Sequence, residues 1–351
     1  LSHAQLWVGN TGRTVKARHP LPPFTTASLQ QAASKGLGLS PEKTMALAQT
    51  LYEQGLITYM RTDGVSVAPE AQSAARDTIA REYGPDYLPL TIPTYTVKTA
   101  NAQEAHEAIR PTDIIRLPQE AKGDAAALYG LIWKRFMASQ MAPALYTLTG
   151  AVIYAGKAQR QPFPMAFRAQ GRSPLFDGFL KVYQEPANEG DESEVDGTLP
   201  VLTENQPLKL IAPQVEEHQT RAPARYTEAA LVQALEQRGI GRPSTYASMV
   251  KTVKDKGYVM LSQKRLVPSE NGMRLCDFLM THFAGVLAYG YTARLEEQLD
   301  GIATGETTRL NVLREFWDGF QPQVVKATEV ALTKLKGQSA PKPLMLHTAR
   351  E

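Results

Sequence analysis

The sequence predicts an α+β protein of several domains, in which helical regions flank a region of strands. Three observations support this: a length of 351 residues, which is long for one domain; apolar residues at helical spacing in both flanks; and β-branched and aromatic runs between them. We expect residues 1–22 and 146–222 to form one β-rich domain. Residues 23–145 and 223–335 should form helical domains, and residues 336–351 a tail.

The first helical region contains three stretches with helix signals. "SPEKTMALAQTLYEQG" has Ser40 as N-cap, Pro41 at the first helical position and Gly55 just past its end. A second helix should start near Ser66–Pro69 and include "EAQSAARDTIAREYG", and a third covers "DAAALYGLIWKRFMASQM" and ends before Pro143. The apolar face of the first helix is expected to comprise Met45, Leu47, Ala48, Leu51 and Tyr52.

The β-rich region is read from runs separated by Gly and Pro. "YTLTGAVIYAG", "PFPMAFRAQG", "FDGFLKVYQ" and "PLKLIAPQVEEHQT" are predicted strands. The insert "EPANEGDESEVDG" is expected to be a solvated loop, because its carboxylates lack the regular spacing of a metal site. At the N-terminal end, short apolar pieces finish at the Pro-rich "RHPLPPFTT", which indicates a domain boundary.

The second helical region contains one hairpin. "TEAALVQALEQRG" is a helix with Thr227 as N-cap and Gly239 as its stop, "PSTYASMVKTVKDKGYV" is a second helix after a tight turn, and "YVMLSQKRLVPS" is a pair of strands. This order is typical of winged-helix DNA-binding modules, although many helical hairpins also end in a strand pair.

The composition excludes several classes of protein. A hydrophobic content of 43% and a charged content of 21% are those of an ordinary globular protein, and no apolar run approaches a membrane span or a signal peptide. The single cysteine, Cys276, excludes an internal disulfide and a four-cysteine zinc site, and favours an intracellular setting. Nine Lys and Arg against four Asp and Glu in residues 221–270 fit either a polyanion-binding face or a solvated helix surface.

The decapeptide "GLITYMRTDG" contains a candidate nucleophile. In an extended stretch the side chains of Tyr59 and Arg61 point to one side, so the guanidinium could hold a phosphate while the phenol attacks it. Ile57 and Met60 would anchor the segment in a core. The alternative is that Tyr59 is a half-buried aromatic residue with its hydroxyl at the surface.

A second cluster, "QEAHEAIRPTD", could bind phosphate. His106 and Arg110 would share a face if the run is helical, with Pro111 ending the helix. Glu107 could instead pair with Arg110 as a structural ion pair.

A third cluster, "GIGRPSTYAS", resembles an anion site at a helix start. Gly241 precedes Arg242, Ser244 and Thr245, and backbone N–H groups, hydroxyls and a guanidinium would meet there. Ordinary N-capping by Ser244 or Thr245 explains the hydroxyls but not the glycines beside an arginine.

These three motifs, in this order, resemble those of the type IA DNA topoisomerases, the bacterial topoisomerase I group, and "PPFTTASLQQAASKGLG" is similar to that family's run upstream of the tyrosine. The resemblance implies that Tyr59 is the nucleophile, linked to a 5′ phosphate of single-stranded DNA, and that Arg61 positions that phosphate. It implies DNA contacts by the other motif residues: Thr58, Asp63, His106, Arg110, Gly241, Arg242, Ser244 and Thr245.

The resemblance also implies a toroidal core with a gate: a helical domain bearing the tyrosine, a β-rich arch and a winged-helix-like helical domain. The family usually has Ser where this chain has Gly64. The family's N-terminal metal-binding (TOPRIM) domain and its cysteine-rich zinc elements have no match, so we expect a central fragment whose Mg²⁺ ligands lie outside this chain.

From the resemblance we expect ATP-independent relaxation of negative supercoils in the full-length enzyme, by cleavage, strand passage and religation. The fragment should bind single-stranded and negatively supercoiled DNA without relaxing it, as a monomer, in the cytoplasm and associated with the nucleoid. A tyrosine recombinase is disfavoured because its tyrosine follows the His and Arg in sequence. A non-enzymatic winged-helix regulator would explain residues 227–270 alone.

Overall fold

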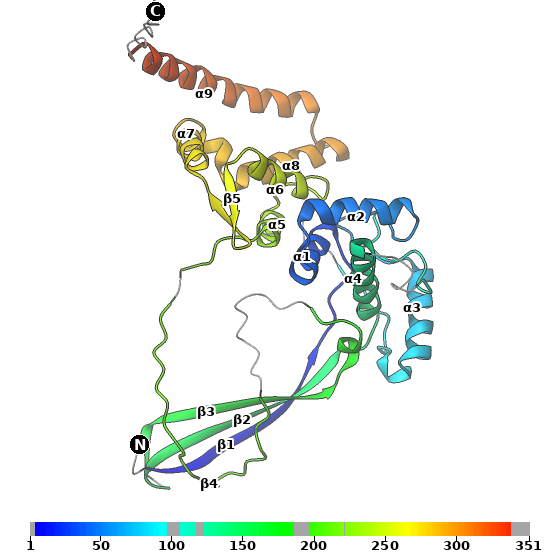
Figure 1. Cartoon of the computed structure of the whole chain (residues 1–351), viewed down its shortest axis with the longest axis vertical. Helices are drawn as coiled ribbons and strands as arrows, with labels where there is room; N and C mark the ends of the chain where they lie inside the picture. Colours follow the sequence, from blue (N-terminus) through cyan, green and yellow to red (C-terminus); the bar gives the residue numbers. More distant parts are fainter. Residues whose placement is uncertain are drawn as a thin grey trace, which may run out of the picture.

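A computed structural model describes residues 4–96, 106–116, 123–159, 161–185, 197–220 and 222–337. Three parts are distinguished in Figure 1: a four-helix body (α1–α4), a long sheet (β1–β4) that extends away from it, and a C-terminal helical region (α5–α9 with β5 and β6). The acidic insert, apart from its two ends, lies outside the described residues, as do residues 103–105 and 338–351.

The four-helix body begins with a well-capped helix pair. Its helices are α1 (Thr26–Leu37), α2 (Pro41–Glu53), α3 (Pro69–Glu82) and α4 (Gly123–Ser139), and a 3₁₀ turn, η1 (Pro85–Tyr87), follows α3. The predicted capping of α2 is confirmed, because the Ser40 hydroxyl accepts a hydrogen bond from the Lys43 N–H. Gly55 follows the helix in the left-handed region at φ 69°.

The apolar face predicted for α2 is confirmed only in part. Ala48 and Leu51 are fully buried and Met45 and Leu47 are partly buried, but Tyr52 is 41% exposed. Tyr52 lies in the last turn of the helix, where its ring contacts another aromatic residue at the surface instead of the core.

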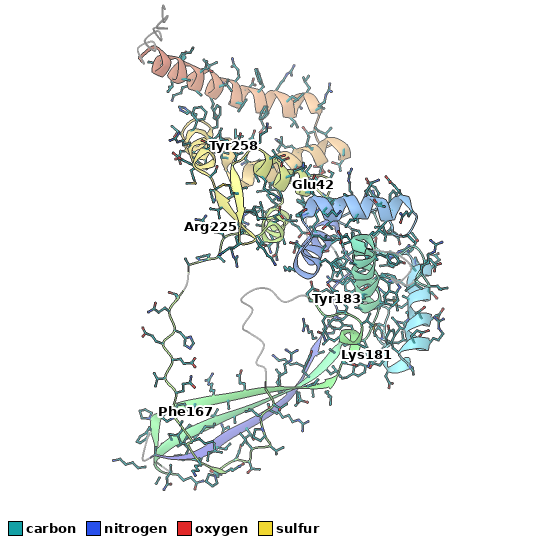
Figure 2. The ribbon with its side chains drawn as sticks, in the orientation of Figure 1. Glu42, Phe167, Lys181, Tyr183, Arg225 and Tyr258 are labelled. Carbon is teal, nitrogen blue, oxygen red and sulfur yellow. The ribbon has the colours of Figure 1, made fainter. Side chains whose placement is uncertain are left out.

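Arg135 on α4 ties the body to the two segments that lead from the sheet. The side chain is 5% exposed; its Nε donates to the Pro22 carbonyl at 2.7 Å, and its guanidinium pairs with Glu185 at 2.6 Å. Pro22 follows β1 and Glu185 follows β3. The buried Arg135 side chain therefore holds both chain segments that connect the sheet to the four-helix body. Tyr183 lies at the same junction (Figure 2), and the Arg135 guanidinium lies 5.5 Å from its ring centre.

The long sheet is antiparallel and combines strands from distant parts of the chain. Strands β1 (Gln5–Arg18), β2 (Ala144–Ala158), β3 (Gln161–Phe176) and β4 (Pro207–Leu208) are arranged in the order β3-β2-β1-β4. Two predicted strands, "YTLTGAVIYAG" and "PFPMAFRAQG", are thereby confirmed as β2 and β3.

The other two predicted strands are wrong for most of their length. "FDGFLKVYQ" ends β3 and then forms a 3₁₀ helix, η3 (Gly178–Lys181), because Gly178 turns the chain at φ 51° against the Ala142 and Pro143 carbonyls. The turn buries Phe179 in the core of the body. "PLKLIAPQVEEHQT" pairs with β1 only at β4, and its residues 211–220 are exposed and belong to no helix or strand (Figure 1).

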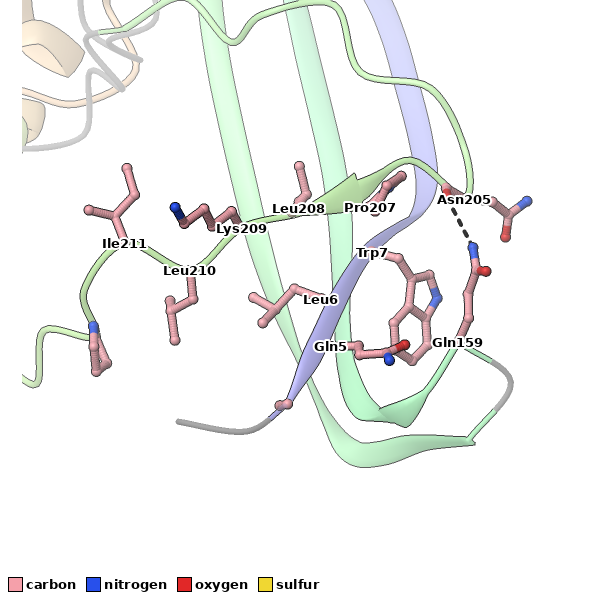
Figure 3. Close-up of a pocket in the computed structure, with 12 residues that line it drawn as sticks. Gln5, Leu6, Trp7, Gln159, Asn205, Pro207, Leu208, Lys209, Leu210 and Ile211 are labelled. Atoms are coloured by element: carbon pink, nitrogen blue, oxygen red, sulfur yellow. Dashed lines mark hydrogen bonds between the residues drawn. The ribbon is translucent and has the colours of Figure 1, made fainter.

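At the far end of the sheet, β4 and the residues after it enclose a cavity of about 620 Å³ against β1 (Figure 3). Trp7 and Leu208 contribute apolar surface, and Gln159 donates to the Asn205 carbonyl at 2.9 Å. These contacts hold the short β4 against the end of the long strands.

The C-terminal helical region begins with the predicted helix–helix–hairpin order, which is confirmed. Thr227 caps α5 (Glu228–Gln237) by accepting from the Ala230 N–H. Helix α6 (Tyr246–Asp255) follows, and β5 (Val259–Ser262) pairs with β6 (Arg265–Pro268) around a turn with positive φ at both central residues. Three further helices complete the region: α7 (Glu270–Leu287), α8 (Tyr289–Thr304) and α9 (Arg309–Gly337).

The C-terminal region rests on the four-helix body through α5 and α6. Ala27 of α1 shares a small buried cluster with Val232, Tyr246 and Val250. Lys251 on α6 pairs with Glu42 on α2 at 2.7 Å; Glu42 is labelled in Figure 2. Within the described residues, no helix is both long and apolar enough to span a bilayer.

Candidate active site

Tyr59 and Arg61 point out of the fold from a segment whose neighbours are buried. Ile57 and Met60 are each 1% exposed, as predicted for anchoring residues, whereas Tyr59 is 41% exposed and Arg61 is exposed. Burial alternates from Tyr59 to Thr62, although these residues do not form a regular strand. Neither the Tyr59 hydroxyl nor the Arg61 guanidinium bonds to another residue in the described part of the chain, so both remain accessible to a ligand.

The backbone around Arg61 is fixed by Thr26, at the first position of α1. The buried Thr26 hydroxyl donates to the Met60 carbonyl at 2.7 Å and accepts from the Thr62 N–H at 2.8 Å, while the Thr26 N–H donates to the Thr62 carbonyl at 2.8 Å. On the other side, the Tyr52 ring meets the Tyr59 ring edge to face, with centres 5.3 Å apart. The segment is therefore rigid while its two functional side chains are exposed.

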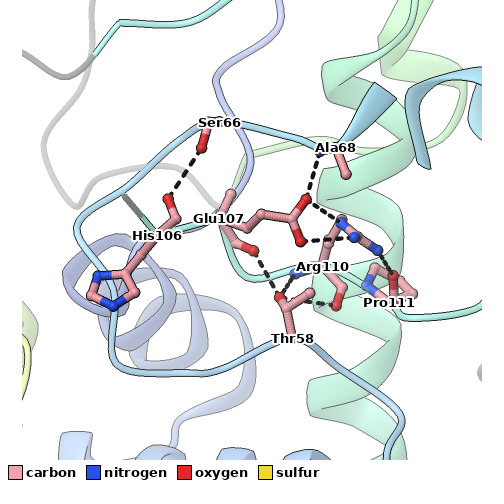
Figure 4. Close-up of polar contacts among 8 residues, drawn as sticks. Thr58, Ser66, Ala68, His106, Glu107, Arg110 and Pro111 are labelled. Carbon is pink, nitrogen blue, oxygen red and sulfur yellow. Dashed lines mark hydrogen bonds and ion pairs between the residues drawn. The ribbon is translucent and has the colours of Figure 1, made fainter. Parts of the chain in front are cut away.

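His106 and Arg110 do not lie on a helix, so the condition under which they would share a helical face is not met. The described residues 106–111 are extended and form isolated bridges, Ile109 with Phe24 and Pro111 with Ile57. They therefore lie alongside residues 57–62, which we call the tyrosine segment. The Thr58 N–H donates to the Arg110 carbonyl at 2.9 Å and the Thr58 hydroxyl donates to the Ala108 carbonyl at 2.7 Å (Figure 4). Pairing with a second segment overrides the local helical spacing.

Arg110 forms the ion pair that was the alternative to a phosphate clamp. Its guanidinium lies 2.8 Å from the Glu107 carboxylate, which also accepts from the Ala68 N–H at 2.5 Å (Figure 4). The Arg110 side chain is only 11% exposed. His106 is exposed, and its carbonyl accepts from the Ser66 hydroxyl at 3.1 Å. His106 is therefore better placed than Arg110 to meet a ligand.

Gly64 is required by close packing. A Cβ at this position would collide with the His106 carbonyl, and the Gly64 N–H donates to the Thr62 hydroxyl at 2.9 Å. The absence of a side chain thus lets the 106–111 segment approach the tyrosine segment.

The glycine-rich turn before α6 is arranged differently. Gly241 has φ 85°, and the Arg242 N–H donates to the Thr245 hydroxyl at 2.9 Å. The Thr245 hydroxyl makes no capping bond to α6, so the alternative of ordinary N-capping does not hold for this residue, and Ser244 is exposed. The Arg242 guanidinium lies 2.6 Å from Asp300 and 3.6 Å from Glu296, both on α8.

One hollow joins two of the sequence motifs. A cavity of about 700 Å³ between the four-helix body and the C-terminal region is lined by Asp63 from one side and by Gly241 and Arg242 from the other. Tyr246 also lines it, and burial raises the pKa of Tyr246 to about 12. Tyr59, Arg61, His106 and Arg110 do not line this cavity.

Sequence reasoning missed three residues that organise the site: Thr26, Arg135 and Tyr246. Thr26 and Tyr246 lie inside quoted motifs, so the motifs pointed to the right segments without distinguishing these roles. Arg135 lies in a helix that reads as ordinary core, and no local pattern marks it.

Within the described residues, no three His, Cys, Asp or Glu side chains are grouped so as to hold a metal ion. Glu107 is engaged with Arg110, and Glu296 and Asp300 with Arg242, while Asp63 does not belong to any cluster of three such side chains in the described part of the chain. These residues do not fit an Mg²⁺ site, which requires several available oxygens.

Comparison with known proteins gives consistent matches. A family model described as DNA topoisomerase matches residues 3–314. DNA topoisomerase 1 of Zymomonas mobilis is 46% identical over 327 residues, which are 92% of this chain and 26% of the relative. DNA topoisomerase 1 of Pseudomonas aeruginosa is 41% identical over 342 residues, which are 94% of this chain and 38% of the relative. Full-length topoisomerase I from Thermotoga maritima superimposes with a TM-score of 0.78 at 35% identity, over 91% of this chain and 52% of that one. The chain therefore spans less than half the length of these two curated relatives.

Proposed function

The chain belongs to the DNA topoisomerase family, and from this premise we propose that it carries the nucleophile of a type IA enzyme. The proposed reaction is ATP-independent cleavage, strand passage and religation of single-stranded DNA, which relaxes negative supercoils. The observation that carries the proposal is the exposed Tyr59–Arg61 pair on a backbone fixed by buried residues.

In the proposed reaction the Tyr59 oxygen attacks a backbone phosphorus. The O–P bond to tyrosine forms, the bond from phosphorus to the 3′ oxygen breaks, and the phenolic proton is taken up as the 3′ hydroxyl leaves. The product is a 5′-phosphotyrosine, and religation is the reverse reaction. Because one phosphodiester replaces another, no ATP is needed. Arg61 is placed two residues away to offset charge on the phosphate oxygens.

The remaining motif residues are proposed to position the strand. His106 and Arg61 would contact phosphates directly. Thr58 and Arg110 support the segment and would reach DNA only if their present bonds exchange. Asp63 with Gly241, Arg242, Ser244 and Thr245 would contact the backbone near the hollow between the two helical parts.

The proposal places Mg²⁺ chemistry outside the described residues, since these do not offer a suitable ligand set. The chain alone is then expected to bind single-stranded and negatively supercoiled DNA as a monomer without relaxing it. The relatives' role in DNA topology supports a cytoplasmic, nucleoid-associated setting.

A chimera tests the proposal. Residues 4–337 replace the matching segment of the Pseudomonas aeruginosa DNA topoisomerase 1, and covalent adduct with labelled single-stranded DNA is measured after denaturation. The parent chimera should form adduct and relax plasmid, whereas Tyr59→Phe should do neither while binding DNA equally well. Tyr52→Phe, which changes the neighbouring exposed phenol, is the matched control and should keep both activities. Adduct in the Tyr59→Phe chimera would show that the nucleophile is a different residue.

A further inference from the structure

The three long strands of the sheet carry only positive charge. Strands β1, β2 and β3 contain Arg13, Lys16, Arg18, Lys157, Arg168 and Arg172, and no Asp or Glu. The whole chain has a net charge of only +3, so this one-sided composition is not a property of the molecule at large. A sheet with this charge attracts polyanions.

Strand register gathers most of this charge on one face. Lys16 pairs with Tyr146, Leu148 with Arg172, and Val152 with Arg168, so these side chains share a face because directly opposed residues point the same way. Arg18 lies two residues beyond Lys16 on that face, whereas Arg13 lies on the other.

This face contains a groove. It has a volume of about 730 Å³, is lined from all three strands by Lys16, Arg18, Tyr146 and Arg172 with small and neutral residues between them, and has no acidic residue in its lining. The Arg172 guanidinium stacks on the Tyr146 ring with its carbon 3.5 Å from the ring centre. Lys16 is exposed and forms no ion pair within the described residues.

The groove offers two kinds of contact at once. Cations bind phosphates, and a guanidinium stacked on an aromatic ring is a flat platform on which a base can lie. A duplex hides the faces of its bases and could use only the cations. Single-stranded DNA can use both.

We propose that this groove is a second binding site for single-stranded DNA, separate from the tyrosine segment. It rests on the proposed function for its substrate, but it shares no lining residue with the hollow that contains Asp63 and Arg242. A strand held there would be retained by the sheet independently of the reaction at Tyr59.

The test measures equilibrium binding of the full chain to a labelled oligothymidylate over a salt series, from about 50 to about 200 mM. Lys16→Ala should reduce the magnitude of the slope of log K against log salt by about 0.7, the value for one phosphate contact on a single strand. Arg13→Ala, which removes the same charge from the other face of the same strand, should leave the slope unchanged. Tyr146→Ala should weaken binding roughly tenfold, and Tyr146→Phe should retain it, because only the first removes the stacking surface.

The outcomes distinguish this site from the proposed function. Equal slopes for Lys16→Ala and the parent chain, or equal losses for Lys16→Ala and Arg13→Ala, would overturn the groove even if Tyr59 forms its adduct in the chimera. The expected slope change without adduct at Tyr59 would support the groove and overturn the proposed nucleophile. A duplex of the same length that loses as much affinity as the single strand on Tyr146→Ala would contradict the stacking role.

Discussion

The tyrosine segment and the glycine-rich turn before α6 both present an arginine beside a helix start, but they hold it in opposite ways. At Tyr59 and Arg61 the backbone is fixed by Thr26 and the side chains are exposed. At Arg242 the side chain itself is held, by Asp300 and Glu296. The first region is ready for a ligand as it stands, whereas the second must exchange an ion pair before its guanidinium can bind phosphate.

The largest expected effect comes from removing an anchor of the tyrosine segment. Met60→Ala should destabilise the four-helix body by about 2–5 kcal/mol, since Met60 is 1% exposed and its loss leaves a cavity. Tyr59→Phe, one residue away but exposed, should change stability by less than about 0.5 kcal/mol.

Denaturant unfolding followed by Trp133 fluorescence measures this difference. Trp133 is buried in the body, and replacing Trp7 and Trp317 by Phe leaves it as the sole tryptophan. Similar midpoints for Met60→Ala and Tyr59→Phe would mean that the segment is not anchored as described.

The next effect concerns Gly64, whose missing side chain makes room for the His106 carbonyl. Gly64→Ser should destabilise the body by about 1–3 kcal/mol, because the new Cβ meets the His106 carbonyl in a packed site. Gly64→Ala should cost a similar amount, as the clash comes from the Cβ and not from the hydroxyl. Gly12→Ala, where an added Cβ meets nothing within 4 Å, is the control. A neutral Gly64→Ser would show that the 106–111 segment can move away.

Local patterns predicted elements well where a cap or a turn marks them. Ser40 and Thr227 begin their helices as expected, and the β5–β6 hairpin follows its turn. The patterns failed where a distant segment decides the conformation: His106 to Pro111 is extended because it pairs with residues near Phe24 and Ile57. Helical spacing cannot report such pairing.

For the site residues too, the sequence predicted what depends on near neighbours and missed what depends on distant ones. Exposure of Tyr59 and burial of Met60 could be predicted from alternation within ten residues. The partners of Arg242 could not, because Glu296 and Asp300 are more than fifty residues away and belong to a helix with no motif of its own. The cationic face of the sheet was missed for a related reason: its charges are spread over three strands and gather only through their register.

A smaller effect is expected from releasing Arg242. The double change Glu296→Gln and Asp300→Asn should strengthen binding of single-stranded DNA by about 0.2–1 kcal/mol, at most about fivefold in Kd, because the guanidinium no longer has to leave a carboxylate. Arg242→Ala added to this background should remove the gain. Fluorescence anisotropy at constant salt measures both, and Glu306→Gln on the loop after α8 controls for the loss of negative charge. If the control gains as much affinity, Arg242 is not the cause.

The smallest effect concerns Glu236, where α5 meets α1. Burial raises the pKa of Glu236 above its ordinary value, while a hydrogen bond from the Gln31 amide partly opposes the rise. The folded chain then holds this proton more tightly than the unfolded chain, so the stability contributed by Glu236 is lost as pH rises from the ordinary pKa through the raised one. Glu236→Gln keeps an acceptor for Gln31 and removes the titration. It should raise the melting temperature slightly at neutral pH, by an amount equivalent to less than about 1 kcal/mol, and this gain should shrink as the pH approaches the ordinary pKa of Glu.

Glu42→Gln, which breaks the exposed pair with Lys251 at the neighbouring α2–α6 contact, should lower stability slightly or leave it unchanged at neutral pH. Thermal unfolding of the three chains over this pH range measures the difference, and a gain for Glu236→Gln that does not change with pH would show that burial of the charge is not its origin.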